Sequence, residues 1–234
     1  MPQLLVTVVN YDFERNAELL KRVFTKSFST LLIDADSPRP PRGTDIPIPN
    51  TYYPGLWNEA VHQAISGNYE WLLFIASDVQ LRNPEQLEPC ILEACANNQI
   101  GVWTPSVHRA SRCASKLVFT RNSGGLRQCS YAEGFCFMVR TDIIKQQYPL
   151  PSWNKSGWGV DVITSWLATE AGYKVCVDDR VLVYHPRARH SHRIERDPAY
   201  DDLTRYCAEF GLDEAARDRF FYSDYEQLQL EQKT

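Results

Sequence analysis

An apolar run that ends in a single carboxylate constrains the fold of this chain more than any other feature. Residues 71–76 are apolar throughout, and Asp78 follows closely. The run is too short to span a membrane, and its continuous apolar character is typical of a strand that is buried on both faces. Because ligands bind beyond the carboxyl ends of strands in open α/β sheets, Asp78 is a candidate site residue.

Two further polar residues lie at the edges of apolar elements downstream. Residues 157–161 read Gly-Trp-Gly-Val-Asp, and an amphipathic helix is expected to begin near Asp161. A second apolar run, at residues 181–184, ends in His185. Two carboxylates and an imidazole placed in this way can supply a metal site and a general base.

Strand and helix patterns alternate through the first half of the chain and become mixed in the second. We expect helices at about 13–24, 54–66, 84–96, from near 161, and at 199–221, and strands at 4–9, 31–33, 71–76, 100–104, 135–139, 175–177 and 181–184, with irregular or hairpin structure at 106–131. This order predicts an α/β fold with a Rossmann-like, mostly parallel central sheet, flanking helices and a mixed C-terminal half. We expect one domain, residues 1–234, whose parts are 1–105, 106–186, and a flap with C-terminal helices (187–234).

Composition excludes some classes of function. A net charge of -4 without a block of basic residues argues against a nucleic-acid-binding protein. The seven cysteines form no Cys-x-x-Cys pair, residues 1–10 pass directly into a strand pattern, and no apolar run approaches ~18 residues. We therefore expect no transmembrane segment and a location that is cytoplasmic or peripheral to a membrane.

Together, these motifs resemble those of the GT-A glycosyltransferases, above all the inverting family 2, over residues 4–186. Residues 6–11 resemble the opening strand and loop of that family, 33–37 its nucleotide-binding acidic segment, and 56–60 the helix that follows. Residues 75–79 fall on the Asp-x-Asp metal motif, 184–185 on the late histidine ligand, and 157–161 on a Gly-Trp-Gly-Glu-Asp motif like that of galactosyltransferase-type enzymes. The order and spacing of these motifs carry the resemblance, since no single one is specific.

The resemblance implies a metal-dependent transfer of a sugar from a nucleoside diphosphate to a hydroxyl, with inversion. It makes residues 1–105 the nucleotide-sugar-binding half of the domain and residues 106–186 the acceptor and catalytic half. Asp78 and His185 would bind Mn²⁺ or Mg²⁺, and Asp161 would be the base. Donor binding is expected from Asn10, Tyr11, Asp34, Asp36, Asn58, Ser77 and Arg187, the last in a basic flap at 187–193; acceptor binding is expected from Glu133, Gly134, Trp158 and Gly159.

Each of these residues has a simpler structural interpretation. Asp161 could be a helix N-cap, Asp36 a turn residue, and His185 a core histidine whose hydrogen bonds are satisfied. For Glu133, an acceptor contact and a purely structural role are about equally expected. The ring of Trp158 could simply pack, and the flap could be a solvated basic loop. His190 and His192 are alternative metal ligands if the flap folds inward.

Two departures from the family pattern leave other functions open. Ala76 stands where the first acid of the metal motif would be, and Val160 stands where the glutamate of the second motif would be. The main expectation is a hexosyl- or deoxyhexosyltransferase that uses a UDP, GDP or dTDP sugar in glycan or polysaccharide biosynthesis, with a carbohydrate, lipid-linked or protein-linked acceptor. One alternative is a catalytically degenerate protein that binds nucleotide or carbohydrate. Another is a nucleotidyltransferase-like enzyme, which would need a glycine-rich loop after the first strand, but residues 10–13 contain no glycine.

Overall fold

The first half of the chain builds a parallel α/β unit. The structure is a computed structural model that describes residues 2–111, 116–186 and 196–220. Its first elements are β1 (Leu4–Asn10), α1 (Glu14–Phe24), β2 (Ser29–Asp34), β3 (Ile46–Pro47), α2 (Tyr52–Ser66), β4 (Trp71–Ala76), β5 (Gln80–Leu81), a 3-10 turn η1 (Pro84–Gln86) and α3 (Leu87–Ala96). Pairing of β1 with β2 and with β4 is parallel, as the alternation of strands and helices predicts.

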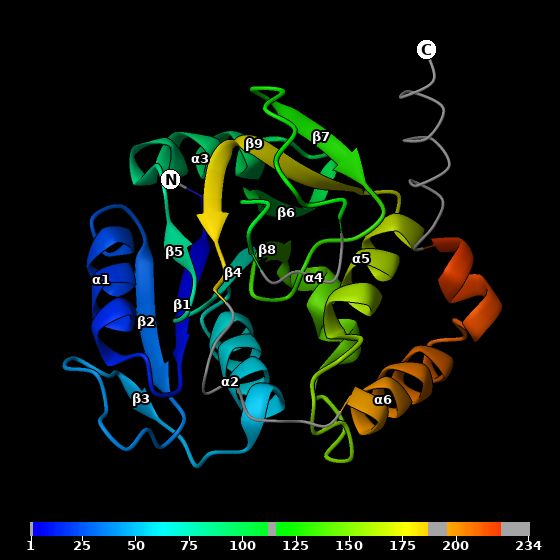
Figure 1. The fold of residues 1–234 in the computed structure, drawn as a ribbon, viewed down its shortest axis with the longest axis horizontal. Helices are drawn as coiled ribbons and strands as arrows, with labels where there is room; N and C mark the ends of the chain where they lie inside the picture. Colours follow the sequence, from blue (N-terminus) through cyan, green and yellow to red (C-terminus); the bar gives the residue numbers. More distant parts are fainter. Residues whose placement is uncertain (1, 112–115, 187–195, 221–234) are drawn as a thin grey trace.

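The second half adds antiparallel strands to the same sheet. It contains β6 (Ile100–Val107), β7 (Leu126–Cys129), β8 (Cys136–Arg140), α4 (Thr141–Ile144), η2 (Lys145–Gln147), α5 (Val160–Glu170), β9 (Lys174–Tyr184) and α6 (Arg196–Glu209). Within the described ranges the sheet order is β3-β2-β1-β4-β8-β6-β9-β5, with β7 paired to β9 (Figure 1). Strand β8 runs antiparallel to both β4 and β6, so the two parallel parts of the sheet join across it. The expected mixed C-terminal half is confirmed.

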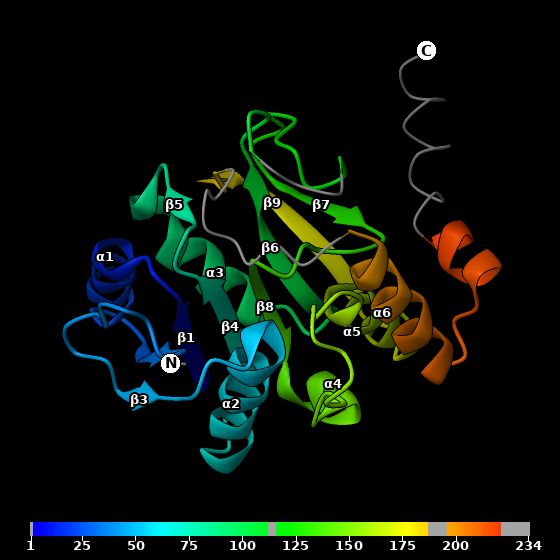
Figure 2. The same ribbon diagram turned by 60° about the horizontal axis from the view of Figure 1, so that its bottom comes forward.

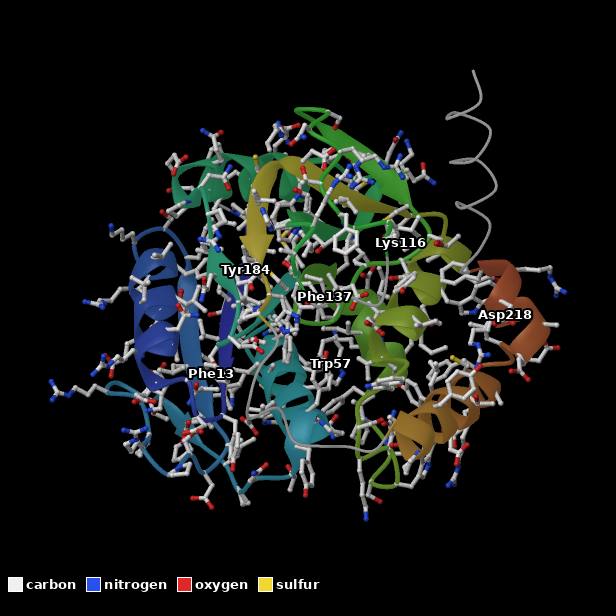
Figure 3. All side chains as sticks on the ribbon, viewed as in Figure 1. Phe13, Trp57, Lys116, Phe137, Tyr184 and Asp218 are labelled. Carbon is white, nitrogen blue, oxygen red and sulfur yellow. The ribbon has the colours of Figure 1, made fainter. Side chains whose placement is uncertain are left out.

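Helices cover both faces of this sheet. On β8, Phe137 stacks on Trp57 of α2, with ring centroids 5.5 Å apart, and Met138 contacts Cys95 of α3. Because adjacent residues of a strand point to opposite faces, α2 and α3 lie on opposite sides. Helix α4 contacts both α2 and α5, and these three helices form one layer, in front of the sheet in Figure 2. Figure 3 shows Trp57 and Phe137 close together at the centre of the molecule. The strands between the layers are therefore almost fully buried.

Three local expectations differ from the structure. Residues 175–177 and 181–184 belong to one strand, β9, because a bulge accommodates the polar residues 178–180 between them: Pro105 of β6 pairs with Asp178, and the next residue pairs with Leu182. The helix expected at 199–221 ends at Glu209 near Gly211, whose φ is +74°, and helix resumes at 214–220. The irregular region expected at 106–131 includes β7, which pairs with β9.

No helix in the described parts of the chain combines the length and the apolar character that are needed to cross a membrane.

Candidate active site

The candidate site residues lie at one edge of the sheet, where the parallel strands end. Asn10 ends β1, Asp34 ends β2, and Asp78 follows β4. Because β8 is antiparallel to β4, the segment that precedes β8 lies beside the end of β4, and the backbone N–H of Ala76 donates to the carbonyl oxygen of Phe135 at 2.8 Å. The topology therefore brings residues 133–135 to the same edge as Asp78.

Asp78 and His185 lie in direct contact although they are far apart in the sequence. Strand β5 pairs antiparallel with the end of β9, Gln80 opposite Tyr184, and this pairing aligns the residues that flank it. Nε2 of His185 lies 3.1 Å from Oδ2 of Asp78. The imidazole stacks on the ring of Phe135, with centroids 4.4 Å apart and planes 15° apart, which fixes its orientation. His185 therefore lies half-buried at the sheet edge beside a carboxylate, and its role as a metal ligand stays a prediction.

The geometry of this pair fits two ligands of one divalent cation. Two ligand atoms that each lie about 2.1 Å from an ion, at right angles, are about 3 Å apart. Oδ1 of Asp78 is buried, and no group in the described residues forms a hydrogen bond with it. Those residues include no cluster of three or more His, Cys, Asp or Glu side chains that could hold a metal ion. Asp78 and His185 would thus supply one carboxylate and one imidazole, leaving the other positions to phosphate oxygens and water.

Asp161 lies half-buried at the start of α5. The N-cap of this helix is Gly159, with φ +91°, so the interpretation of Asp161 as the N-cap is wrong. Its Oδ2 accepts a hydrogen bond from the N–H of Gly134 at 3.0 Å, and its Oδ1 accepts one from the N–H of Val162 at 2.9 Å. Burial and, second, the nearby carboxylate of Glu133 raise the pKa of Asp161 to about 7, against the opposing effect of the two N–H groups. A carboxylate with a pKa of about 7 is suited to act as a general base near neutral pH.

Two of the expected donor residues form a buried polar network at the ends of β1 and β2. The amide Nδ2 of Asn10 donates to Oδ1 of Asp34 at 2.7 Å, and the hydroxyl of Ser37 donates to the same oxygen at 2.6 Å. Asp36 is exposed and has a φ of +54°, a backbone conformation that turn residues adopt. The loop is therefore held rigidly by Asp34, and the recognition of a donor by these residues stays a prediction.

The other expected donor residues have different surroundings. Buried Ser77 accepts through its carbonyl oxygen from Nδ2 of Asn16 at 2.6 Å. The amide of Asn58 instead binds the backbone of Leu150, accepting from its N–H at 2.8 Å. Tyr11 is half-buried beside Asn10. Arg187, with the rest of the expected flap and both His190 and His192, lies outside the described residues.

The expected acceptor residues lie on the two segments that meet at Asp161: residues 133–134 and the loop before α5. Trp158 is 42% exposed, so part of the residue faces solvent, and its contact with an acceptor stays a prediction. Its loop is anchored to α6, since both the N–H and the hydroxyl of Ser156 donate to Oδ2 of Asp202, at 3.0 and 2.8 Å. Glu133 is buried next to Gly134. An exposed tryptophan thus precedes the helix that carries Asp161, and Glu133 lies close enough to Asp161 to raise its pKa.

Sequence reasoning missed three residues that organise the site. Phe135 links β4 to His185. Its carbonyl oxygen accepts a hydrogen bond from the N–H of Ala76 in β4, and its ring stacks on the imidazole of His185. Asn16 binds the carbonyl oxygens of Ser77 and Val79 on either side of Asp78. Tyr53 donates to the carbonyl oxygen of Gly134 at 3.1 Å. Proximity to Glu133 and Gly134 was the available signal for Phe135; Asn16 and Tyr53 lie in helices with no motif of their own.

Known protein structures match the fold of this chain, whereas known sequence families do not match its sequence. The sequence matches no protein-family model and no curated protein sequence. Among solved structures, GalNAc-T7 with UDP, GalNAc and Mn²⁺ superposes with a TM-score of 0.65 at 10% identity, over 94% of this chain and 50% of that one. TarS 1-349 of S. aureus with UDP-GlcNAc superposes with a TM-score of 0.62 at 15% identity, over 95% of this chain and 71% of that one. This chain spans 42% of the longer TarS chain, at a TM-score of 0.63.

The sheet order, the helical layers and these superpositions define the fold. It is the GT-A fold of glycosyltransferases, so the fold expected from the sequence is confirmed. The level of identity shows the fold alone, and the chemistry has to be argued from the residues of this chain.

Proposed function

We propose that the protein is a metal-dependent, inverting glycosyltransferase that moves a sugar from a nucleoside diphosphate to a hydroxyl acceptor. One observation carries the proposal: residues 133–135 connect the Asp78–His185 pair to the carboxylate of Asp161. The ring of Phe135 stacks on His185, which lies beside Asp78, while the N–H of Gly134 donates to Asp161. This arrangement supports a cation site for phosphate charge next to a base for acceptor deprotonation.

The proposed reaction needs one base and one sink for negative charge. Asp161 takes the proton of the acceptor hydroxyl, and the acceptor oxygen forms a bond to the anomeric carbon. The bond from that carbon to the diphosphate oxygen breaks, and its electron pair leaves with the diphosphate. A cation bound at Asp78 and His185 would supply Lewis-acid stabilisation of that charge. Because a single base faces the acceptor side, a one-step displacement with inversion is favoured.

The donor and acceptor classes belong to the same proposal. GalNAc-T7 and TarS bind UDP or a UDP sugar, which supports a UDP sugar ahead of GDP and dTDP donors. Mn²⁺ in the GalNAc-T7 structure and the imidazole of His185 support Mn²⁺ ahead of Mg²⁺. The exposed indole of Trp158 favours a carbohydrate acceptor, free or linked to lipid or protein, because an aromatic face covers the C–H surface of a sugar. The proposal includes hexosyl or deoxyhexosyl transfer in glycan or polysaccharide biosynthesis.

Thiol chemistry supports the proposed compartment. The described cysteines are free, and burial raises the pKa of most of them, Cys207 to about 12 for example. Buried thiols of this kind fit the reducing conditions of the cytoplasm, which we propose as the location of the enzyme, in solution or at a membrane surface.

A thermal-shift screen tests the proposal. The purified protein is mixed with UDP, GDP or dTDP sugars, with and without Mn²⁺, and compared with Asp78→Ala and with a matched control, Asp142→Ala, at an exposed position after β8. Binding of a donor to the native state raises the melting temperature. We expect metal-dependent stabilisation by a UDP sugar that Asp78→Ala loses and Asp142→Ala keeps.

The second candidate is a degenerate GT-A protein that binds nucleotide or carbohydrate without turnover. Ala76 and Val160, which replace two acids of the family pattern, favour it. Donor binding without release of free nucleoside diphosphate, on any tested acceptor or water, would support this candidate. Donor binding by the wild-type protein that is the same with and without Mn²⁺ would count against both the cation site and the metal-dependent transferase. A nucleotidyltransferase-like activity would instead appear as release of diphosphate from a nucleoside triphosphate.

A further inference from the structure

Tyr53, near the start of α2, is linked to the proposed base through one peptide group. Its hydroxyl donates to the carbonyl oxygen of Gly134 at 3.1 Å, and the N–H of Gly134 donates to Oδ2 of Asp161 at 3.0 Å. These two bonds fix Gly134 from both sides. A helix of the nucleotide-binding half of the fold thus reaches the carboxylate that we place on the acceptor side.

Two glycines allow this tyrosine to approach the site closely. A Cβ atom on Gly134 would lie 2.9 Å from Oη of Tyr53 and 3.5 Å from Oδ2 of Asp161. A Cβ atom on Gly157, where φ is +72°, would lie 2.2 Å from Cδ1 of the same ring. The segment before β8 and the loop that carries Trp158 therefore both close against Tyr53.

The ring of Tyr53 is itself held by the core. It stacks on Trp57, with centroids 6.5 Å and planes 12° apart, and it contacts Phe74 of β4 at 5.3 Å. Burial and, second, the carboxylate of Asp161 raise the pKa of Tyr53 well above its ordinary value. The hydroxyl therefore stays protonated and remains a hydrogen-bond donor at any pH at which the protein works.

We propose that Tyr53 is a positioning residue that sets the orientation of Asp161 through the peptide of Gly134. The inference rests on the proposed function, in which Asp161 is the base. Other titratable groups that influence Asp161 are Glu133, on the segment before β8, and Cys207, on α6. Removal of the hydroxyl frees the carbonyl of Gly134, and the hydrogen bond from its N–H to Asp161 then weakens, which favours the protonated acid.

The test compares Tyr53→Phe with a control that loses a hydroxyl elsewhere, Tyr173→Phe, whose Oη contacts exposed Asp142 at 3.4 Å. Nucleoside diphosphate release is measured with the nucleotide sugar that the thermal-shift screen selects, with Mn²⁺ present. For Tyr53→Phe we expect kcat to fall about tenfold with the donor KM within about twofold, since one hydrogen bond is lost away from the donor. We also expect the acidic limb of the kcat profile to move to higher pH. Behaviour of Tyr53→Phe like that of Tyr173→Phe would overturn the inference.

A second measurement does not depend on turnover. The protonation of Asp161 is followed by the ¹³C chemical shift of its carboxyl group across pH, in the wild-type protein and in Tyr53→Phe. A titration midpoint that rises in Tyr53→Phe supports positioning, and an unchanged midpoint contradicts it. If Asp161→Asn keeps full activity, the proposed base is wrong, but the carboxyl titration still decides whether Tyr53 controls Asp161.

A double-mutant cycle with Gly134→Ala locates the effect. In the wild-type background the added methyl group meets the hydroxyl of Tyr53, so Gly134→Ala should lower kcat strongly. In Tyr53→Phe that obstacle is absent, and the second substitution should cost clearly less. Costs that simply multiply would show that the two groups act independently and would overturn the proposed link.

Discussion

Two acidic clusters in this molecule have opposite electrostatic surroundings. In the bulge of β9, Asp178 is fully buried and receives hydrogen bonds from Arg180 at 2.8 and 2.9 Å and from the indole of Trp103 at 3.2 Å. Burial alone would raise the pKa of Asp178, but these bonds outweigh it and the pKa is lowered. At the start of α5, Asp161 is half-buried, and burial together with its charged neighbour Glu133 raises its pKa to about 7.

The difference separates a structural role from a chemical one. Asp178 and its neighbour Asp179, which pairs with Arg127 at 3.0 Å, are neutralised where they stand, and their ion pairs hold a bulge in the middle of a strand. Asp161 lacks such compensation in the described residues and keeps a proton that it can exchange near neutral pH. An ionised carboxylate next to another acid lowers stability, and such arrangements are common at catalytic sites.

The largest expected effect comes from Asp161→Asn. Loss of the base should lower kcat by about 10²- to 10⁴-fold, because an amide cannot take the acceptor proton. The measurement is nucleoside diphosphate release in the presence of acceptor, with donor affinity from the thermal shift as the control for a folded site. Retention of more than a tenth of the wild-type rate would contradict the assignment of the base.

Breaking the other cluster should affect stability instead. Arg127→Ala leaves Asp179 buried without its ion pair and removes hydrogen bonds to the carbonyl oxygens of Leu117 and Phe119. We expect the free energy of unfolding in urea to fall by about 3 kcal/mol. Arg39→Ala is the control, since Arg39 is 78% exposed and lies 3.9 Å from Glu14, and its loss should change stability by less than about 0.5 kcal/mol. Equal effects of the two substitutions would remove the distinction between the clusters.

The pH dependence of stability should carry the signature of Asp161. Its pKa in the folded protein, about 7, lies above the value of about 4 for an unfolded chain, so the folded state binds more protons between these limits. Stability from this group is therefore complete below pH 4 and is lost as the pH rises to 7. At pH 8 we expect the free energy of unfolding, measured in urea, to be on the order of 2 kcal/mol higher for Asp161→Asn than for the wild-type protein. At pH 4 this difference should disappear. An advantage independent of pH would show that ionisation of Asp161 is not its cause.

The difference between the clusters also shows what the sequence could predict. A carboxylate directly after an apolar run identified Asp78, and a histidine directly after another identified His185, because each strand end is visible locally. Their contact depends on the short β5 strand, which has too few residues to give a pattern. The bulge of β9 was missed for a related reason: Asp178, Asp179 and Arg180 look like the end of a strand until their ion pairs are seen.

Residues that act through long-range pairing were beyond sequence reasoning. Phe135 and Tyr53 meet the site because β8 inserts antiparallel between β4 and β6, and no local spacing encodes that insertion. Asn58 matched a family helix by its neighbours in sequence, but its amide is engaged by the backbone of Leu150, on the segment that leads to the Trp158 loop. Fold class follows from periodicity within segments, whereas the partners of a side chain follow from pairings between them.

The smallest expected effect sharpens the comparison most directly. Glu133→Gln keeps the shape of the side chain and removes the negative charge that distinguishes the pocket of Asp161 from the bulge of β9. Because this charge helps to raise the pKa of Asp161, the acidic limb of the kcat profile should move to lower pH, while kcat at pH 8 should change less than about twofold. Glu170→Gln, at the exposed far end of α5, should leave the profile in place. A limb that stays unchanged in Glu133→Gln would assign the shift to burial alone, and a raised acceptor KM would instead place Glu133 against the acceptor. A limb that moves to lower pH would show that the charge of Glu133 adds to burial in raising the pKa of Asp161, which is the contribution that Asp178 lacks.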